Sequence, residues 1–263
     1  MSVKLGIIGG TGVYNPEILT DPQEQTVSTP YGEVRLIVGN FCDRSVAFMN
    51  RHGAGHSVPP HLVNYRANIA ALKKLGVKTV LATAAVGSLN PSMEPGHLVF
   101  TDQFLDFTKT RQTSFFDGGP AGVVHIDMTN PYCPELRDTL YRTARELGLM
   151  CHPVGIYICT EGPRFETAAE IKMYRRFGGD LVGMTGVPEV VLAREAEMCY
   201  ATVAMVTNYA AGISPTNLTH QEVLDTMASN SEHIRKLLMQ TVASLDPERN
   251  CSCQHALNPL VPA

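Results

Sequence analysis

The sequence predicts an α/β protein with a single domain, in which a β-sheet is flanked by helices. Short apolar segments alternate with longer amphipathic segments along the chain, and this alternation is typical of an α/β sandwich. With 263 residues and 44% hydrophobic content, the chain can bury one large core. We therefore expect one domain over residues 1–245, followed by an extended tail over residues 246–263, where the periodicity is lost.

The expected strands and helices follow from these two patterns. Apolar segments with the length of strands lie at 4–8, 34–38, 45–50, 79–85, 97–104, 154–160, 181–184 and 202–208. Amphipathic segments with the length of helices lie at 61–75, 134–147, 167–177, 188–196 and 219–245. Pro134 and Pro188 fall in first turns, where proline is tolerated because its missing N–H would have no partner in the helix.

The charge of the chain limits its partners. A formal net charge of -4 and the lack of any basic block argue against binding of nucleic acid, which needs neutralisation of phosphates. The segment Leu5–Gly10 is too short and too rich in glycine for a signal peptide, and no apolar run approaches the length of a membrane span. We expect a cytoplasmic protein with a small-molecule ligand and no membrane or nucleic-acid partner.

Two segments predict a purine pocket. A Gly-Pro turn at 162–163 precedes Phe165 and Glu166, so that an aromatic ring and a carboxylate follow the end of an apolar strand. The ring can stack on a flat heterocycle while the carboxylate binds its edge. Asn208 ends another strand and offers the donor and the acceptor that the edge of a 6-oxopurine needs. The alternative is structural, with Glu166 or Thr167 capping the next helix.

Three other segments suit an anion. Glycines in 6–12 let backbone amides approach a phosphate, with the Thr11 hydroxyl beside them. A dinucleotide fingerprint fits less well there, because Asn15 occupies the position of its third glycine. The Arg51 guanidinium, next to His52, can hold two phosphate oxygens. Segment 83–88 ends a strand in small residues, so its backbone amides can face an anion.

Four motifs in this sequence resemble those of the purine nucleoside phosphorylase and methylthioadenosine phosphorylase family. The resemblance runs from about residue 4 to about residue 245. The motifs are Gly6-Ile7-Ile8-Gly9-Gly10-Thr11-Gly12, Arg51-His52-Gly53, Gly162-Pro163-Arg164-Phe165-Glu166-Thr167, and Gly183-Met184-Thr185 with Val187-Pro188-Glu189-Val190. It implies a nucleoside phosphorylase-like α/β/α sandwich with a mixed sheet. It also implies a pentosyltransferase of purine salvage that uses inorganic phosphate as co-substrate, needs no cofactor, and forms a homotrimer or homohexamer.

The resemblance also assigns roles to individual residues. The phosphate ligands would be Thr11, Arg51, His52, Ala84, Ala85 and Thr185. The residues that contact the nucleoside would be Phe165, Glu166, Met184, Asn208, Ala210, His220 and His125. Methylthioadenosine phosphorylases typically have threonine where this chain has Ala84, so one hydroxyl is lost. Met184 would pack under the ribose, with core packing as the alternative, and His125 would reach the site of a neighbouring subunit unless it is a structural histidine.

The implied reaction is phosphorolysis, in which phosphate attacks the anomeric carbon and releases the purine and ribose 1-phosphate. Asn208, at N7 and O6, and Glu166, at the N1 proton, would be the catalytic residues. Adenine carries a lone pair at N1, and adenine-specific relatives have Asp-x-Asp where this chain has Asn208-Tyr209-Ala210. We therefore expect 6-oxopurine ribonucleosides, inosine and guanosine, as substrates.

Other functions remain open from the sequence. His220 aligns with a histidine that meets the 5′-hydroxyl in nucleoside phosphorylases, whereas methylthio-specific relatives have an apolar residue there. If His220 lies on the surface instead, the substrate could be S-methyl-5′-thioinosine or 5′-methylthioadenosine. A non-catalytic nucleotide-binding protein and an NAD-dependent oxidoreductase are more remote alternatives.

Metal binding is not expected from the sequence. His52, His56 and His61 have no carboxylate among them, and five of the seven cysteines show no paired spacing. Cys251-Ser252-Cys253 with His255 could form part of a metal site, but no fourth ligand lies nearby in the sequence. Some heat-stable archaeal members of the resembled family carry a similar Cys-Ser-Cys that forms a disulfide. A disulfide and an inert tail both remain open.

Overall fold

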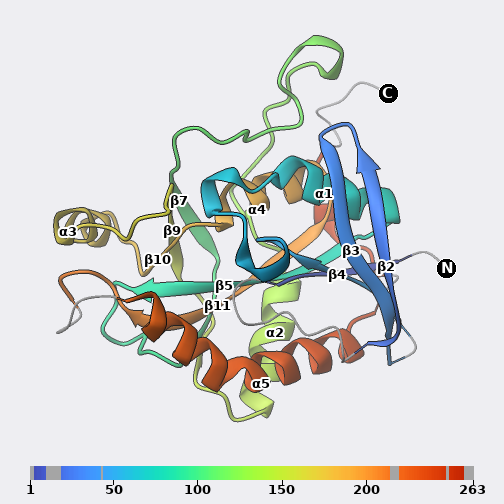
Figure 1. The fold of residues 1–263 in the computed structure, drawn as a ribbon. Coiled ribbons are helices and arrows are strands. Elements are labelled where there is room, and N and C mark those ends of the chain that lie inside the picture. The colour runs from blue at the N-terminus through green and yellow to red at the C-terminus, as the bar shows by residue number, and fades with distance from the viewer. Residues whose placement is uncertain (1–2, 10–18, 43, 214–218, 247–248, 258–263) are drawn as a thin grey trace.

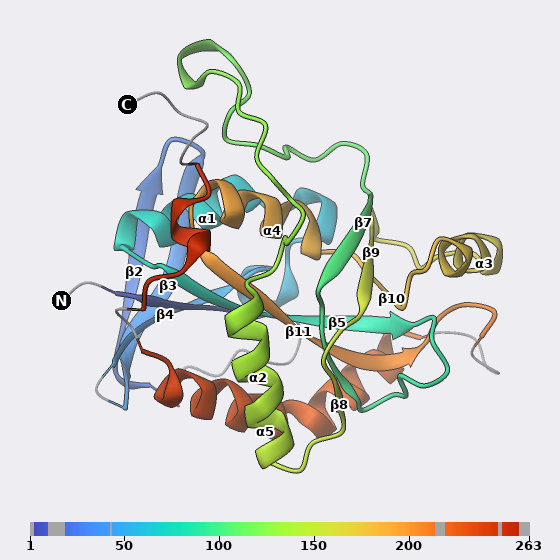
Figure 2. The same cartoon turned by 180° about the vertical axis from the view of Figure 1, so that it is seen from behind.

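The computed structural model describes residues 3–9, 19–42, 44–213, 219–246 and 249–257. A single mixed sheet of eleven strands forms the middle layer. Helices α1 and α4 cover one face of the central strands, and helices α2 and α5 cover the other (Figures 1 and 2). This arrangement confirms the predicted α/β sandwich.

The elements have the following bounds. The strands are β1 (Leu5–Gly9), β2 (Thr20–Thr29), β3 (Gly32–Phe41), β4 (Arg44–Asn50), β5 (Thr79–Ser88), β6 (Leu98–Phe100), β7 (Gln103–Phe107), β8 (Cys151–His152), β9 (Ile156–Thr160), β10 (Leu181–Gly183) and β11 (Cys199–Tyr209). The helices are α1 (Tyr65–Leu75), α2 (Pro134–Glu146), α3 (Ala168–Arg176), α4 (Gly186–Glu195) and α5 (His220–Ser244). Among these residues, no helix is long and apolar enough to cross a membrane.

The sheet topology brings several strand ends to one edge. The main strand order is β2-β3-β4-β1-β5-β10-β9-β7, and β11 pairs with both β5 and β6. Strands β4, β1, β5 and β11 run parallel to one another. Their carboxyl ends therefore lie at the same edge, which is where open α/β sheets usually bind ligands.

Burial on both faces of the sheet accounts for the continuous apolar sequences of β5 and β11. Both strands are covered by helices on two faces, so almost every side chain is buried whichever way it points. One apolar cluster packs β5 against α1 and α4, with Ile69 and Leu72 fully buried. A second cluster packs β11 against α2 and α5, where Leu140 and Leu237 are fully buried.

Strand β11 contains one irregularity that bears on the site. Val206 pairs with Val86 and Asn208 pairs with Gly87, so Thr207 is an extra residue without a partner in the ladder. This is a β-bulge, which bends a strand and changes the direction of the side chains beyond it. Both Thr207 and Asn208 consequently face the pocket described below.

Most predicted elements are confirmed, with corrections in three places. Segment 97–104 is not one strand but two, β6 and β7, because Thr101 and Asp102 between them are not part of either strand. The Asp102 carboxylate accepts a hydrogen bond from Gly155 N at 2.9 Å. Strands β2 and β8 were not predicted, since β2 is polar and almost wholly exposed. All five predicted helices are present, and Pro134 is the first residue of α2.

The prediction of an extended tail is wrong for residues 249–257. Ser252–His255 form a short 3₁₀ helix, and Cys251 and Cys253 on either side of its start are buried in the same apolar cluster as α2, α5 and β11. These two side chains anchor the segment to the body of the protein. The division at residue 245 stays a prediction.

Candidate active site

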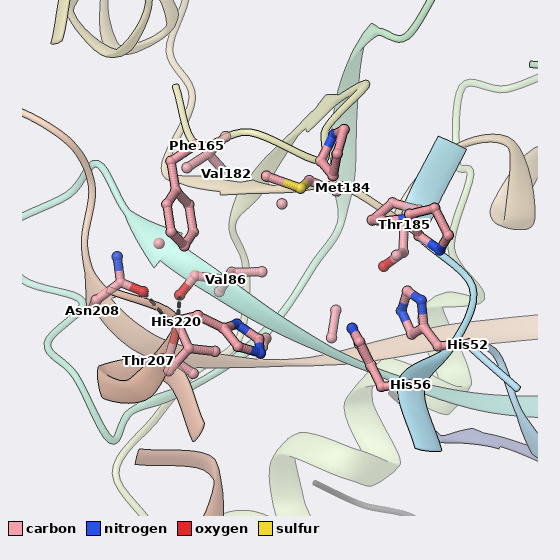
Figure 3. A pocket seen from close by; sticks show the side chains of 18 of the residues that line it. His52, His56, Val86, Phe165, Val182, Met184, Thr185, Thr207, Asn208 and His220 are labelled. Atoms are coloured by element: carbon pink, nitrogen blue, oxygen red, sulfur yellow. Dashed lines mark hydrogen bonds between the residues drawn. The ribbon is translucent and has the colours of Figure 1, made fainter. Parts of the chain in front are cut away.

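A pocket of about 430 Å³ lies at the carboxyl edge of the parallel strands (Figure 3). The loop after β4, the ends of β5 and β11, the segments after β9 and β10, and the start of α5 surround it. It brings together nearly all the predicted site residues, namely Arg51, His52, Ala84, Ala85, Phe165, Glu166, Met184, Thr185, Asn208, Ala210 and His220. Thr11 and most of its glycine loop lie outside the described residues. His125 is exposed and is not among the described residues that line the pocket.

Arg51 is held rigidly at one side of the pocket. Its Nε and Nη2 donate to the two carboxylate oxygens of Glu189 at 2.6 and 2.7 Å, and its Nη1 donates to the Thr83 carbonyl at 2.8 Å. Burial alone would lower the pKa of Arg51, but the charge and hydrogen bonds of Glu189 more than offset it, so the pKa is raised. Because these bonds use three of the five guanidinium N–H groups, two remain for a ligand.

His52 lies beside Arg51 as a neutral imidazole. Burial and the nearby Arg51 charge lower the pKa of His52 to about 4. Its Nδ1 is 2.9 Å from the Val58 carbonyl, which can only accept, so Nδ1 carries the hydrogen and Nε2 carries a lone pair. In this form His52 can accept a hydrogen bond from a protonated phosphate oxygen.

Thr185 completes this side of the pocket. It precedes α4, and its side chain makes no capping hydrogen bond, while its backbone amide donates to the Tyr157 hydroxyl at 3.2 Å. The hydroxyl of Thr185 is therefore the group with which this residue can bind a ligand. Arg51, His52 and Thr185 together make this side suitable for an anion.

The opposite side of the pocket suits a flat heterocycle. The ring of Phe165 and the Asn208 amide project into the same part of the pocket, with Met184 nearby (Figure 3). Asn208 Oδ1 lies 2.8 Å from the Thr207 hydroxyl, and Asn208 Nδ2 donates to the Tyr209 carbonyl at 2.9 Å. One N–H of the amide is left to donate to a ligand.

Glu166 is a buried carboxylate next to this side. Burial raises its pKa, although the Thr160 hydroxyl, which donates to it at 2.7 Å, acts in the opposite direction. Of the two residues considered as a helix cap, Thr167 is the cap of α3 and forms a reciprocal capping box with Glu170, whereas Glu166 does not cap the helix. Glu166 is therefore free to bind a ligand.

His220 lies at the first position of α5 and lines the pocket. Its ring centroid is 6.2 Å from that of His56, which in turn is 4.3 Å from that of His52 (Figure 3). Burial, and then the proximity of His220, lower the pKa of His56. Val223, one turn further along α5, also lines the pocket.

The sequence did not indicate several residues that line the pocket or support its side chains. His56 was considered only as a metal ligand, although its place in the pocket is beside His52 and His220. Glu189 belongs to one of the sequence motifs, but its ion pair with Arg51 could not be predicted, because the two residues are 138 positions apart in the sequence. The buried carboxylate is what fixes the direction of the guanidinium.

No fourth ligand lies near Cys251-Ser252-Cys253 in the sequence, but the fold brings two distant cysteines to this motif, whereas His255 bonds to Asn250 instead. In the folded chain, the sulfur atoms of Cys133, Cys199, Cys251 and Cys253 all lie within 4.8 Å of one another. Cys133 and Cys199 are far away in sequence, so the spacing of the motif gave no sign of them. This cluster is separate from the pocket.

The sequence profile of the phosphorylase superfamily matches residues 4–243, and the chain belongs to this superfamily. A probable 6-oxopurine nucleoside phosphorylase from Dictyoglomus turgidum is 59% identical to it over 97% of both chains. A 6-oxopurine nucleoside phosphorylase from Pyrococcus furiosus is 55% identical, also over 97% of both chains. The chain is thus a member of the purine nucleoside phosphorylase and methylthioadenosine phosphorylase family.

A solved structure agrees with this assignment. The methylthioadenosine phosphorylase from Schistosoma mansoni in complex with adenine superimposes with a TM-score of 0.92 at 35% identity, covering 98% of this chain and 97% of that one. The likeness extends over the sheet and its helices, so the fold predicted from the sequence is that of the family.

Proposed function

We propose that this chain is a purine nucleoside phosphorylase that cleaves 6-oxopurine ribonucleosides such as inosine and guanosine. Inorganic phosphate is the co-substrate, and the products are the free base and ribose 1-phosphate. The observation that carries the proposal is the pair formed by Glu166 and Asn208 in one pocket, across from Arg51. The names of the relatives from D. turgidum and P. furiosus support the same substrate class.

The preference for 6-oxopurines follows from hydrogen-bond polarity. Hypoxanthine and guanine carry a hydrogen on N1, which an ionised Glu166 can accept, and the remaining N–H of Asn208 can donate to O6. Adenine has a lone pair at N1 and an amino group at C6, so both contacts would be mismatched. Two mismatched buried contacts at about 1–3 kcal/mol each give roughly 30-fold to 10⁴-fold discrimination.

The anion side positions the nucleophile. Phosphate is already negatively charged at neutral pH, so it needs to be held beneath the sugar rather than activated by a base. Arg51 and Thr185 bind its oxygens, and neutral His52 accepts from an oxygen that carries a proton. As the bond to the purine breaks, negative charge develops on the base, and the one free N–H of the Asn208 amide stabilises it, shared between N7 and O6.

The subunit arrangement forms part of the proposal. The segment that links β7 to α2 extends away from the sheet (Figures 1 and 2), and His125 lies exposed on it. We place His125 at the 5′ end of the nucleoside in a neighbouring subunit, in a homotrimer or homohexamer. The setting is purine salvage in the cytoplasm, with phosphate as co-substrate and no cofactor.

A second candidate substrate is S-methyl-5′-thioinosine. Val223 lies one turn after His220 and also lines the pocket, so an apolar group is present beside the histidine. A thioether could pack against Val223, whereas a 5′-hydroxyl would bond to His220.

The test is base release from inosine, guanosine, adenosine, methylthioadenosine and methylthioinosine, each with and without phosphate. We expect rapid release from inosine and guanosine only when phosphate is present. Equal rates in phosphate-free buffer would indicate a hydrolase, and a wide preference for methylthioinosine would favour the second candidate.

A further inference from the structure

The cluster of four cysteines lies where three parts of the chain meet, and Figure 2 shows the C-terminal segment beside the starts of α2 and β11. Cys133 immediately precedes α2, Cys199 is the first residue of β11, and Cys251 and Cys253 belong to the C-terminal segment. All four side chains are buried. The substrate pocket does not use any of them.

The spacing of the sulfurs suits a tetrahedral metal ion. All four atoms lie within 4.8 Å of one another, and the Cys133 and Cys251 sulfurs are 3.7 Å apart. A tetrahedral Zn²⁺ ion with Zn–S bonds of about 2.3 Å holds its sulfur ligands about 3.8 Å apart. Disulfide bonding needs about 2.05 Å between sulfurs, and all four cysteines are free thiols in this structure.

Polar groups around the cluster suit thiolate ligands. The Nη2 of Arg249 donates to Cys133 Sγ at 3.3 Å, and Gln254 Nε2 lies 4.0 Å from Cys199 Sγ. A zinc ion bound by four thiolates carries a net charge of about -2, which the Arg249 guanidinium would partly neutralise. Cys133 also lies at the amino end of α2, a helix of 13 residues, where the helix dipole favours a thiolate.

We propose that Cys133, Cys199, Cys251 and Cys253 form a structural Zn²⁺ site. Binding would replace the thiol protons, with up to four protons released as four Zn–S bonds form and no change in oxidation state. Four protein ligands leave no open coordination position, which is the arrangement of a structural site rather than a catalytic one. The ion ties the C-terminal segment to α2 and β11.

The place of the site in the fold separates it from the chemistry. Cys199 begins β11 and Asn208 lies near its other end, nine residues on. At about 3.3 Å per residue, the two are about 30 Å apart. Loss of the metal should therefore lower stability and leave the rate of base release at room temperature nearly unchanged.

The first experiment measures zinc in protein purified without chelators. We expect elemental mass spectrometry to find about one zinc ion per chain. Cys199→Ser and Cys253→Ser should each reduce the zinc content by about tenfold or more, because three thiolates hold the ion much more weakly. Cys42→Ser is the matched control, since Cys42 is exposed and lies outside the cluster, and its zinc content should equal that of the wild type.

A second experiment uses the wild type alone, so that misfolding of a variant cannot decide the result. The protein is denatured with a chelator and no reductant, and its cysteines are alkylated and counted by mass. All seven should react if the cluster held zinc. Removal of zinc from the folded protein should lower Tm by about 5–15 °C, and Co²⁺ added in its place should give thiolate charge-transfer absorption.

Two results would overturn the proposal. Protein without zinc, in which four cysteines resist alkylation until a reductant is added, would show two disulfides instead. Protein without zinc in which all seven cysteines react would show a simple cluster of thiols. Neither result depends on base release, so the proposed activity can stand or fall separately.

Discussion

Glu189→Gln should separate two roles of Arg51, as the partner of a buried carboxylate and as a phosphate ligand. Glu189 is fully buried and Arg51 is 4% exposed. Besides holding the guanidinium, Glu189 accepts a hydrogen bond from the Tyr200 hydroxyl at 2.7 Å. The substitution keeps the shape of the side chain but leaves the positive charge of Arg51 unpaired in the core.

The cost in stability follows from this burial. Removing one partner of a buried ion pair costs about 3–5 kcal/mol. In a chain of this size, 1 kcal/mol shifts Tm by about 2–4 °C, so Tm should fall by about 6–20 °C in buffer without phosphate. The same argument applies to Arg51→Ala, which would leave Glu189 as an unpaired negative charge, and makes that variant a poor probe of phosphate binding.

Phosphate should restore part of this loss. A bound anion would compensate the unpaired guanidinium, so the variant should gain more stability from phosphate than the wild type does. Ligand at about 100 times its Kd stabilises a protein by about 2.7 kcal/mol, or roughly 5–11 °C here. At the phosphate concentration that raises the Tm of the wild type by this amount, we expect the Tm of Glu189→Gln to rise by more.

The control is Glu195→Gln, in the same helix. Glu195 is 3% exposed and accepts from the Ser114 hydroxyl and the Phe115 amide, both at 2.7 Å, so its partners are neutral. This variant should lose less stability, and its response to phosphate should match the wild type. Scanning calorimetry with and without phosphate measures both effects. If phosphate raises the Tm of Glu189→Gln no more than that of Glu195→Gln, Arg51 does not bind phosphate.

Four further predictions concern individual side chains. Asn208→Asp should reduce kcat/KM for inosine by about 10²-fold or more, because the new carboxylate repels charge on the leaving purine; unchanged selectivity between inosine and adenosine would remove residue 208 from base recognition. Lowering the pH through the raised pKa of Glu166 protonates it, so the ratio of inosine to adenosine cleavage should fall, and a Glu166→Gln variant that kept the same pH dependence would contradict this. His52 has a pKa of about 4 in the folded protein and about 6.5 in the unfolded chain, so the unfolded chain binds more protons between these pH values. The free energy of unfolding therefore falls as the pH is lowered through this range, by up to about 3 kcal/mol. His52→Gln should lose correspondingly less stability between about pH 7 and about pH 4.5 in urea unfolding, and an equal loss would refute the assignment. His220→Val should weaken inosine cleavage and favour methylthioinosine, since an apolar wall suits a thioether; steady-state kinetics on both substrates would show no change if His220 does not reach the 5′ position.

The sequence predicted best those elements whose burial is decided locally. The run Thr79–Ala85 was correctly assigned to a strand because helices cover both of its faces, which makes almost every residue apolar. Strand β2 escaped notice because its residues are polar and exposed, and only pairing with β3 fixes its conformation. Propensity alone does not reveal such a strand, although β3 follows after only two residues, because no apolar alternation marks it.

The same distinction holds for the pocket. Phe165, Glu166 and Asn208 could be proposed because each stands at the end of a recognisable strand or turn. The ion pair of Arg51 with Glu189 could not, because it joins positions 138 residues apart. The grouping of Cys133 with Cys251, 118 residues apart, is of the same kind. Contacts of this range depend on the packing of whole elements, which no local pattern encodes.

The bulge in β11 has a consequence for how relatives on this scaffold can diverge. Thr207 has no partner in the ladder, so residues 207 and 208 can both face the pocket while the rest of the strand keeps its pairing with β5. A substitution at either position changes the polar groups that line the pocket without disturbing the register that the core requires. Substrate preference can therefore change through single substitutions, such as an amide for a carboxylate, while the fold stays the same.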